Sequence, residues 1–391
     1  MCMQLLITLC FRELLKSGEL RGGSFALYHQ GELVVEVYGG YADEENRVEW
    51  KKQTLGRLFS STKAFAAVTI AFLVDRGLLN YDERVAKYWP EFAQNGKDQI
   101  TLRQLISHQA GLAAIDELFS IYDIIERPGK VGDILAKQKP QWNPGSKFGY
   151  HGITLGLYLD QIVRRVDPDH RNLAEFFHDE IALPLELDAG IGLPNKEYYR
   201  VAKMGKIRLF NLDLFKVSHY WKFIYIYITN QDHWAYKAII NPKEYEDDNL
   251  VNNPTFASTP NPSTHGYGTA TSAAKLFGIL ANGGMWNGKK IISANIINKL
   301  NIPEVSGEDQ CVFFQQTMGL GTKLLKSPQG NYIFGTPGAG GQMVYADPKA
   351  NLGWAFLNND CKIYAFGEDP RYKKVEKAIY ETLETINNKR D

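Results

Sequence analysis

Ser60 and Lys63 stand three residues apart, where an apolar segment begins. In an α-helix this spacing puts both side chains on one face, about one turn apart. Residues 64–74 are apolar on every side, which is typical of a buried helix, and Lys63 is the only charged residue between Ser60 and Val74. Burial lowers the pKa of a lysine, so that it can act as a base. A serine at a helix N-terminus lies near free N–H groups that favour developing negative charge, as acyl transfer requires.

The same four-residue pattern occurs a second time, at Ser272 and Lys275. Lys275 begins an ordinary amphipathic pattern after a Thr/Ser cap region, so we expect its side chain to point to water. Lys63 has no polar direction open to it except toward Ser60. The alternative interpretation of Lys63 is a lysine that snorkels from the first turn of a core helix. The pattern alone leaves both interpretations open.

A tyrosine and a histidine follow a Pro-Gly turn at Pro144-Gly145. Tyr150, beside a lysine ammonium, could pass a proton between nucleophile and leaving group. His151 is an alternative or assisting base. The structural alternative is strong for both, because the chain has 21 tyrosines and a lone histidine beside a turn often caps a helix or packs in a core.

A glycine-rich segment, 335–342, precedes a strand near the C-terminus. Its glycines would let a substrate approach backbone N–H groups closely. A phosphate loop is excluded because no helix with Lys-Ser/Thr follows. The eight histidines form no H-E-x-x-H and no paired Cys/His spacing, so we expect neither a metal nor another cofactor.

Composition limits the possible partners. The chain has 391 residues, of which 44% are hydrophobic, enough for a large core. Basic and acidic residues number 44 each, so no basic field for nucleic acid is present. The cysteines show no framework spacing and are expected to be reduced thiols of a cytoplasmic protein; they are Cys2, Cys10, Cys311 and Cys361.

Two apolar segments could be mistaken for membrane elements. Residues 1–11 lack a basic n-region and a clear cleavage site, so we expect an amphipathic helix that continues through Leu14 and Leu15, with a secretory signal as the alternative. Residues 223–228 are too few to span a bilayer. We interpret them as core, with a lipid or partner contact as the alternative.

Strand patterns gather near both ends of the chain. Residues 24–28 and 32–38 alternate around His29-Gln30-Gly31, which predicts a hairpin. Further strands are expected at 317–325, 332–335, 342–346 and 352–357. Helices are expected at 60–77, 101–106 and 371–386. The expected fold is α/β in the α+β sense: one antiparallel sheet from both chain ends, flanked by terminal helices, with a mostly helical insertion.

We expect one domain over residues 11–386. Residues 11–80 and about 283–386 would form a sheet-containing lobe, and about 81–282 a mostly helical lobe. Residues 1–10 would be the start of a helix or a weak targeting segment.

In this order, Ser60-x-Thr62-Lys63, Tyr150 after the turn and the glycine-rich strand edge resemble the serine β-lactamase and penicillin-binding-protein superfamily. The sequence is most similar to the class C-like branch, which includes the family VIII carboxylesterases and β-lactamase domain-containing proteins. The resemblance covers about 11–386 and implies the β-lactamase/transpeptidase-like fold. Supporting stretches are 38–43, 100–112, 281–284 and 346–348.

The resemblance implies a role for each matched residue. Ser60 would be the acylated nucleophile, Lys63 its general base or proton relay, and Tyr150 the second proton-transfer group. The backbone N–H groups of Ser60 and Ala339 would form the oxyanion hole. The positions beside the substrate would be His151, Thr336 and Gly338.

Two positions depart from the family pattern. The family's Tyr-x-Asn is Tyr150-His151-Gly152 here, so the amide that contacts substrate is absent, as it often is in the esterase branch. The family's Lys-Thr-Gly or His-x-Gly is Thr336-Pro337-Gly338, so the cation or imidazole is missing. We therefore expect neutral esters to be preferred over substrates that carry a free carboxylate.

The expected function is a serine hydrolase that acts on carboxylic esters through a Ser60 acyl-enzyme. One alternative is a D-amino-acid-type peptidase or weak β-lactamase. Another is a non-catalytic binding or assembly protein on this scaffold. The expected partner is a small-molecule ester or amide, with no nucleic acid and no membrane span, and the sequence does not predict an oligomeric state.

Overall fold

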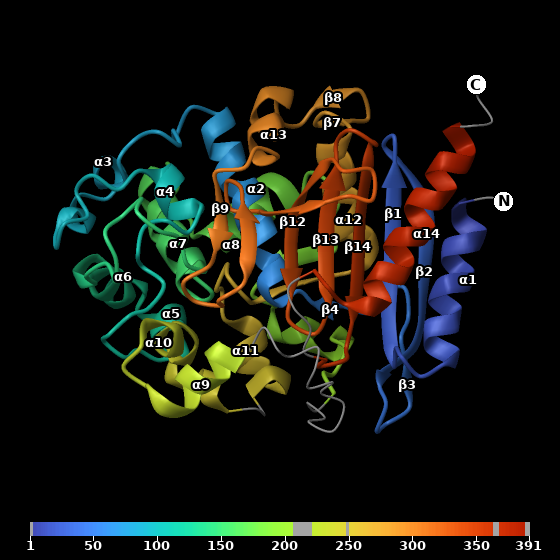
Figure 1. Cartoon of the computed structure of the whole chain (residues 1–391), viewed down its shortest axis with the longest axis horizontal. Coiled ribbons are helices and arrows are strands. Elements are labelled where there is room, and N and C mark those ends of the chain that lie inside the picture. The colour runs from blue at the N-terminus through green and yellow to red at the C-terminus, as the bar shows by residue number, and fades with distance from the viewer. Residues whose placement is uncertain (1–2, 206–220, 248–249, 363–366, 388–391) are drawn as a thin grey trace.

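The computed structural model describes residues 3–205, 221–247, 250–362 and 367–387 (Figure 1). Its largest sheet has nine strands in the order β3-β2-β1-β14-β13-β12-β11-β10-β9, and every neighbouring pair is antiparallel. The strands are β1 (Gly22–His29), β2 (Glu32–Asp43), β3 (Val48–Glu49), β9 (Val305–Glu308), β10 (Gln315–Met318), β11 (Lys323–Lys326), β12 (Tyr332–Gly338), β13 (Gln342–Asp347) and β14 (Leu352–Asn358).

The two ends of the chain meet in the middle of this sheet. β1 pairs with β14 in a register that sets Gly23 opposite Asn358 and Leu27 opposite Trp354. The β1–β2 hairpin and the antiparallel sheet built from both chain ends are therefore confirmed. The strand expected at 317–325 is wrong as one element, because a turn with Gly321 in the left-handed region (φ 77°) divides it into β10 and β11.

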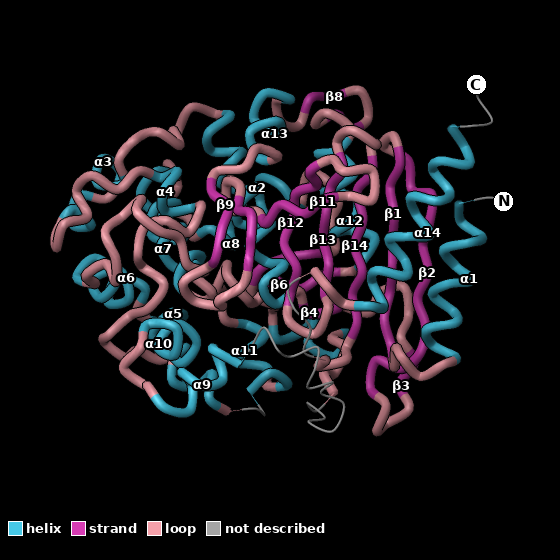
Figure 2. The backbone as a smooth tube through the Cα atoms, in the orientation of Figure 1, coloured by secondary structure: helices cyan, strands magenta, loops and turns pink. Residues whose placement is uncertain are grey.

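Helices cover both faces of the sheet (Figures 1 and 2). The terminal helices α1 (Met3–Lys16) and α14 (Pro370–Asn387) pack together on one face, and α1 buries Ile7, Phe11 and Leu14 there. On the other face lie α12 (Ala270–Ala281) and α2 (Thr62–Asp75). The expected amphipathic N-terminal helix is thus present.

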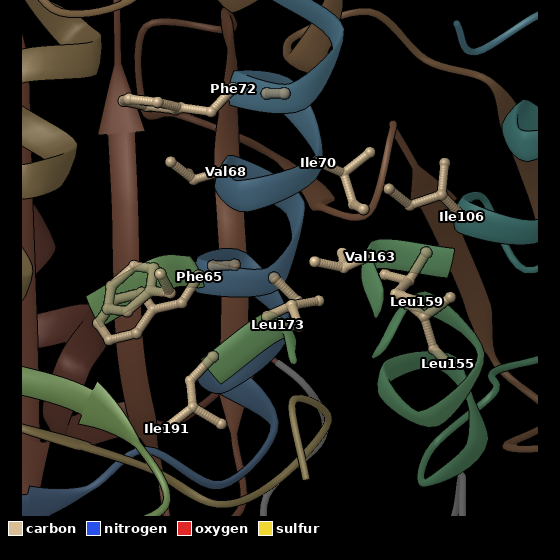
Figure 3. Packing of buried hydrophobic residues seen from close by; sticks show 14 of the residues in the cluster. Phe65, Val68, Ile70, Phe72, Ile106, Leu155, Leu159, Val163, Leu173 and Ile191 are labelled. Carbon is tan, nitrogen blue, oxygen red and sulfur yellow. The ribbon is translucent and has the colours of Figure 1, made fainter. Parts of the chain in front are cut away.

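Helix α2 runs through the centre of the larger core. Its residues from Thr62 to Leu73 are all buried. Figure 3 shows Phe65 and Phe72 on one side of α2 and Ile70 on the other, toward Ile106 and Val163. Burying one such side chain stabilises a fold by about 1.5–3 kcal/mol, so packing on several sides fixes the helix that follows Ser60.

Between the sheet segments the chain is mostly helical. The remaining helices are α3 (Val85–Tyr88), α4 (Leu102–Ile106), α5 (Ile121–Glu126), α6 (Pro128–Lys137), α7 (Thr154–Val166), α8 (Leu173–Phe177), α9 (Trp221–Thr229), α10 (Trp234–Ile240), α11 (Pro254–Ser258) and α13 (Ala294–Leu300). Short strands form two small sheets, one from β4 (Gly56–Arg57), β5 (Ala189–Ile191) and β6 (Gly266–Gly268), the other from β7 (Met285–Trp286) and β8 (Lys289–Lys290).

The segment 223–228 lies in α9. It is not a core segment, contrary to the expectation from the sequence. Tyr225 and Ile228 are exposed and Ile226 is buried, because a short surface helix turns successive apolar side chains both inward and outward. Across the described ranges, no helix combines the length and apolarity needed to cross a bilayer. Cys10 and Cys311 are free thiols, and Cys2 lies outside the described residues.

Candidate active site

Ser60 lies in a tight turn, Phe59–Ser61, that directly precedes α2. The expected helix start at Ser60 is therefore two residues early. Phe59 has φ 46°, a left-handed conformation that is uncommon for a non-glycine residue and is stabilised only by its surroundings. Thr62 supplies that support, because its Oγ1 donates to the Phe59 carbonyl at 2.5 Å and accepts from the Gly266 N–H at 2.7 Å.

The same turn is attached to strand β12. The Ser61 hydroxyl is fully buried and donates to the Thr336 carbonyl at 2.7 Å. A Cβ at Gly338 would lie 2.2 Å from the Leu58 carbonyl oxygen and 3.1 Å from Ser61 Oγ, so only glycine permits this approach. The partly exposed Ser60 side chain is thereby held beside the end of β12.

Lys63 is 1% exposed and its ammonium group is held by backbone carbonyls. Nζ donates to the Gly152 oxygen at 2.6 Å and to the Ser263 oxygen at 2.9 Å. The expectation that its only polar direction is toward Ser60 is therefore wrong, because these two carbonyls carried no sequence signal. Burial lowers the pKa of Lys63 well below its ordinary value. Nζ also lies 4.8 Å from the centroid of the Tyr150 ring.

Tyr150 links the lysine to the serine. The Ser60 side chain lies close enough to the Tyr150 phenol to act on its pKa. Burial raises the pKa of Tyr150, the Ser60 hydroxyl works against this rise, and the nearby carboxylate of Asp309 adds to it. The net shift is upward, so the phenol is protonated at neutral pH. The structure thus brings Ser60, Lys63 and Tyr150 together.

A carboxylate that the sequence did not single out fixes the backbone of Tyr150. Asp309 accepts hydrogen bonds from the N–H groups of Tyr150 at 3.1 Å and Cys311 at 2.7 Å, and from the Gln316 amide at 3.0 Å. It follows β9 and is distant from Tyr150 in sequence. No local motif could have identified it, because its role depends on a contact between distant segments.

His151 is not arranged as a base or as a substrate ligand. Its Nδ1 donates to the Gly149 carbonyl at 2.6 Å, and its Nε2 accepts from the Leu112 N–H at 2.9 Å. Burial lowers the pKa of His151 to about 4. Both ring nitrogens are bonded to backbone, so the expected contact of His151 with substrate is corrected to a structural role.

The two departures from the family pattern have local consequences. A Cβ at Gly152 would meet the Tyr150 ring at 3.3 Å, so glycine gives the ring its room. The Thr336 hydroxyl is buried and donates to the Gly335 carbonyl at 2.7 Å, which turns it away from a substrate role. Ala339 is exposed in the turn that follows Gly338.

A cavity of about 10 Å³, room for about one water molecule, adjoins this group. It contains a second lysine, Lys323, whose pKa burial lowers to about 7, and the buried His108. The cavity therefore has a basic side chain, Lys323, although Thr336 carries no charge. The lining residues are Lys63, His108, Tyr150, Gln316, Met318, Gly321, Lys323, Thr336 and Pro337. In the described part of the chain, no three His, Cys, Asp or Glu residues are grouped as a metal site.

Comparisons with known proteins agree with this fold. The sequence model of the family described as Beta-lactamase matches residues 7–373. Esterase/beta-lactamase LipL of Mycobacterium tuberculosis is 28% identical over 355 residues, which are 86% of this chain and 77% of that protein. The crystal structure of a family VIII carboxylesterase matches with a TM-score of 0.85 and 31% identity, covering 97% of this chain and 98% of that one.

A penicillin-binding protein homologue from Caulobacter crescentus matches with a TM-score of 0.81 and 31% identity over 98% of both chains. These matches confirm the expected α/β fold of the β-lactamase and transpeptidase type. The family match extends over nearly the whole chain, including the sheet and the helical insertion. The chain therefore belongs to the beta-lactamase family of serine hydrolases.

Proposed function

We propose that this hydrolase cleaves carboxylic esters through an acyl-enzyme formed on Ser60. The observation that carries the proposal is the group of three side chains: Ser60 close to the Tyr150 phenol, with the desolvated Lys63 beside the Tyr150 ring. A serine needs an adjacent base to become a nucleophile. Because the pKa of Lys63 is lowered, its amine can be neutral and free to accept a proton. The raised pKa of Tyr150 keeps the phenol protonated. The lysine is therefore the better acceptor of the serine proton.

The environment of Lys63 suits a neutral amine. A neutral amine has two N–H bonds and one lone pair, and the carbonyls of Gly152 and Ser263 accept two hydrogen bonds from Nζ. The lone pair is then left to accept a proton. Gly152 stands where the family has an asparagine. Its contact with Lys63 is made by the backbone carbonyl, so the loss of the asparagine side chain does not remove this contact.

The proposed reaction has two steps. Ser60 Oγ attacks the ester carbonyl carbon while its proton passes to Lys63, directly or through Tyr150. The C–O bond to the alcohol breaks, and the alcohol leaves with that proton delivered by Tyr150. Water then adds to the acyl carbon and gives a proton to the same base. The bond between the acyl carbon and Ser60 Oγ breaks, the base returns the proton to Oγ, and the carboxylic acid leaves.

The oxyanion would be bound by the backbone N–H groups of Ser60 and Ala339. Both belong to segments held close together by the Ser61 to Thr336 hydrogen bond and by the contact of Gly338 with Leu58. Donors fixed in advance stabilise charge that develops in the transition state. Removing one such donor costs about 10²–10³ in kcat in other serine hydrolases.

The ester class is favoured by two relatives whose names state it, an esterase/beta-lactamase and a family VIII carboxylesterase. Turnover of β-lactams or D-amino-acid peptides is the second candidate, favoured by the 31% identical penicillin-binding protein homologue and by Lys323 in the cavity. The preference for neutral esters stays a prediction, because Lys323 is a lysine in the cavity that a substrate carboxylate could use when it is protonated.

The test compares substrates and maps the nucleophile. We expect p-nitrophenyl butyrate to be hydrolysed, a β-lactam such as nitrocefin and a D-alanyl-D-alanine peptide to be hydrolysed more slowly, and a fluorophosphonate to label Ser60 by peptide mass spectrometry. Faster turnover of nitrocefin or of the peptide would favour the second candidate. No labelling and no turnover would overturn the proposal and favour a non-catalytic scaffold.

A further inference from the structure

The turn between β12 and β13 carries the backbone N–H of Ala339, and its conformation depends on glycines. Gly340 and Gly341 have φ 78° and 89°, in the left-handed region that favours glycine. The Gly341 N–H donates to the Gly338 carbonyl at 3.2 Å. A turn built from glycines is intrinsically mobile, so its direction must be set by contacts from elsewhere.

One contact comes from Arg371, in the first turn of α14. Nη2 donates to the Gly340 carbonyl at 2.8 Å. The guanidinium is 1% exposed, and it also pairs with Asp369 at 2.6 Å and Asp360 at 2.9 Å. Two carboxylates therefore fix the orientation of the arginine that contacts the turn.

The fit between this cluster and the turn is close. A Cβ at Gly341 would lie 1.9 Å from Asp369 Oδ2 and 2.8 Å from Arg371 Nη2. A Cβ at Gly340 would lie 2.6 Å from the Asp360 carbonyl oxygen. Only glycine therefore fits at these two positions, because any side chain there would meet the cluster.

Gln342 supports the turn from the sheet. Its Nε2 donates to the Ala339 carbonyl at 3.3 Å and to the Asn358 carbonyl at 3.0 Å, and its Oε1 accepts from the Asn358 N–H at 2.9 Å. The carbonyls of Ala339 and Gly340 are thus both held. Since each peptide unit is planar and each residue has two soft torsions, these bonds restrict where the Ala339 N–H points.

We infer that Arg371 is a positioning residue for the oxyanion hole: it holds the Gly340 carbonyl and so directs the Ala339 N–H toward the charge that forms on the substrate. The inference rests on the proposed function. Removing Arg371 leaves the buried Asp360 and Asp369 carboxylates without this cation and lowers stability, whereas a misdirected oxyanion donor changes the transition state directly. The loss that identifies the positioning role should therefore appear in kcat, measured well below the Tm of each variant.

The test uses Arg371→Met and Arg371→Lys in the full chain. The lysine keeps a positive charge for Asp360 and Asp369 but cannot reproduce the guanidinium fork that also reaches Gly340. For p-nitrophenyl butyrate we expect kcat to fall about ten- to a hundredfold, with KM within about twofold, because binding of the ground state does not use the oxyanion donors. Phenylboronic acid, which forms a tetrahedral adduct on serine, should lose affinity in parallel with kcat.

Arg171→Met is the matched control. Arg171 also joins a carboxylate cluster, with Asp167 at 2.9 Å and Glu180 at 3.0 Å, but it lies in the helical region. We expect it to lose thermal stability and to keep kcat and boronate affinity when assayed well below its Tm. If Arg371→Met does not fold, Arg371→Lys decides, with its fold checked by circular dichroism.

Two results would overturn the inference. One is boronate affinity in the Arg371 variants that stays within about twofold of wild type, less than loss of an oxyanion donor predicts. The other is an equal loss of kcat in Arg171→Met. A wild-type protein that neither hydrolyses the ester nor reacts with the fluorophosphonate would instead remove the proposed function, so the two failures are distinguishable.

Discussion

The pattern of a serine and a lysine three residues apart occurs twice in this chain, in different surroundings. Ser60 lies in a strained turn and Lys63 just after it. The second copy, Ser272 and Lys275, lies inside the first turns of α12. The Ser272 hydroxyl accepts from the Asp188 N–H at 2.9 Å and so fixes a loop. Lys275 donates to the Leu185 carbonyl at 2.7 Å and lies 4.5 Å from the centroid of the Trp286 ring.

The expectation that Lys275 points to water is thus only half right, since its Nζ lies over an aromatic ring and donates to a backbone carbonyl. The difference between the copies is their surroundings. Lys63 has Tyr150 and Ser60 beside it, whereas Ser272 and Lys275 are each bonded to separate backbone groups. Four residues of sequence therefore define a candidate, and the neighbours supplied by distant segments decide what chemistry it could support.

The largest effect should separate the two serines. We expect Ser60→Ala to lower kcat/KM for a neutral aryl ester by more than about a thousandfold, the scale on which a covalent nucleophile contributes. Ser272→Ala should keep activity and lose some stability, since the Asp188 N–H loses its acceptor. Initial rates and fluorophosphonate labelling measure this. Labelling that persists in Ser60→Ala and disappears in Ser272→Ala would reverse the comparison.

The two lysines should differ next. Lys63→Met should lower kcat/KM by about a hundredfold or more, the range of general bases, while Lys275→Met stays near wild type. In the wild type, kcat/KM should rise with pH as Lys63 loses its proton, because only the neutral amine accepts one. Since burial lowers the pKa of Lys63, this rise should lie well below pH 10.5. A pH profile of Lys63→Met with the same rise would contradict the assignment.

Tyr150→Phe should cost less than Lys63→Met, on the order of a hundredfold in kcat, because the phenol relays a proton that the lysine holds. Tyr158→Phe is the control: Tyr158 is buried and donates to the Leu135 carbonyl at 3.2 Å, in a core with no role at the site. A double variant of Lys63 and Tyr150 should lose less than the product of the single losses, because the two serve one proton path. Strict multiplicativity would indicate separate paths.

The smallest effect is a change of stability with pH. Above the lowered pKa of folded Lys63 and below about 10.5, its unfolded value, the unfolded chain binds one proton more than the folded chain. Raising the pH therefore favours folding, by up to about 1.4 kcal/mol per pH unit.

Urea titrations should show the unfolding free energy of the wild type increasing with pH relative to Lys63→Met. The difference in unfolding free energy between the wild type and Lys275→Met should change much less with pH, since Lys275 is only half-buried. Equal slopes for the two lysines would mean that Lys63 is no more desolvated than its counterpart.

Local patterns predicted the elements that depend on local periodicity. Alternation predicted the β1–β2 hairpin, and the continuous apolar run predicted the buried α2. The segment 223–228 has a similar apolar run, but it lies at the surface, because composition does not specify which element packs against a helix.

The site was less accessible to sequence reasoning than the fold. The sequence indicated Ser60, Lys63 and Tyr150 as a group, and the structure brings them together. The carbonyls that hold Lys63 belong to backbone, which has no side-chain signature. Contacts between distant segments bring three further residues to the site: Asp309, Lys323 and Arg371. The left-handed conformation of Phe59 could not be predicted either, because such a conformation is usually signalled by a glycine.

The pairing of β1 with β14 sets the order in which the protein can fold during synthesis. The β1–β2 hairpin leaves the ribosome long before the partner of β1 on its other side, residues 352–358. Contacts so distant in sequence form slowly, and an unpaired strand edge invites association with other chains. Until β14 is made, a nascent or truncated chain exposes the β1 edge and depends on chaperones or rapid completion to avoid aggregation.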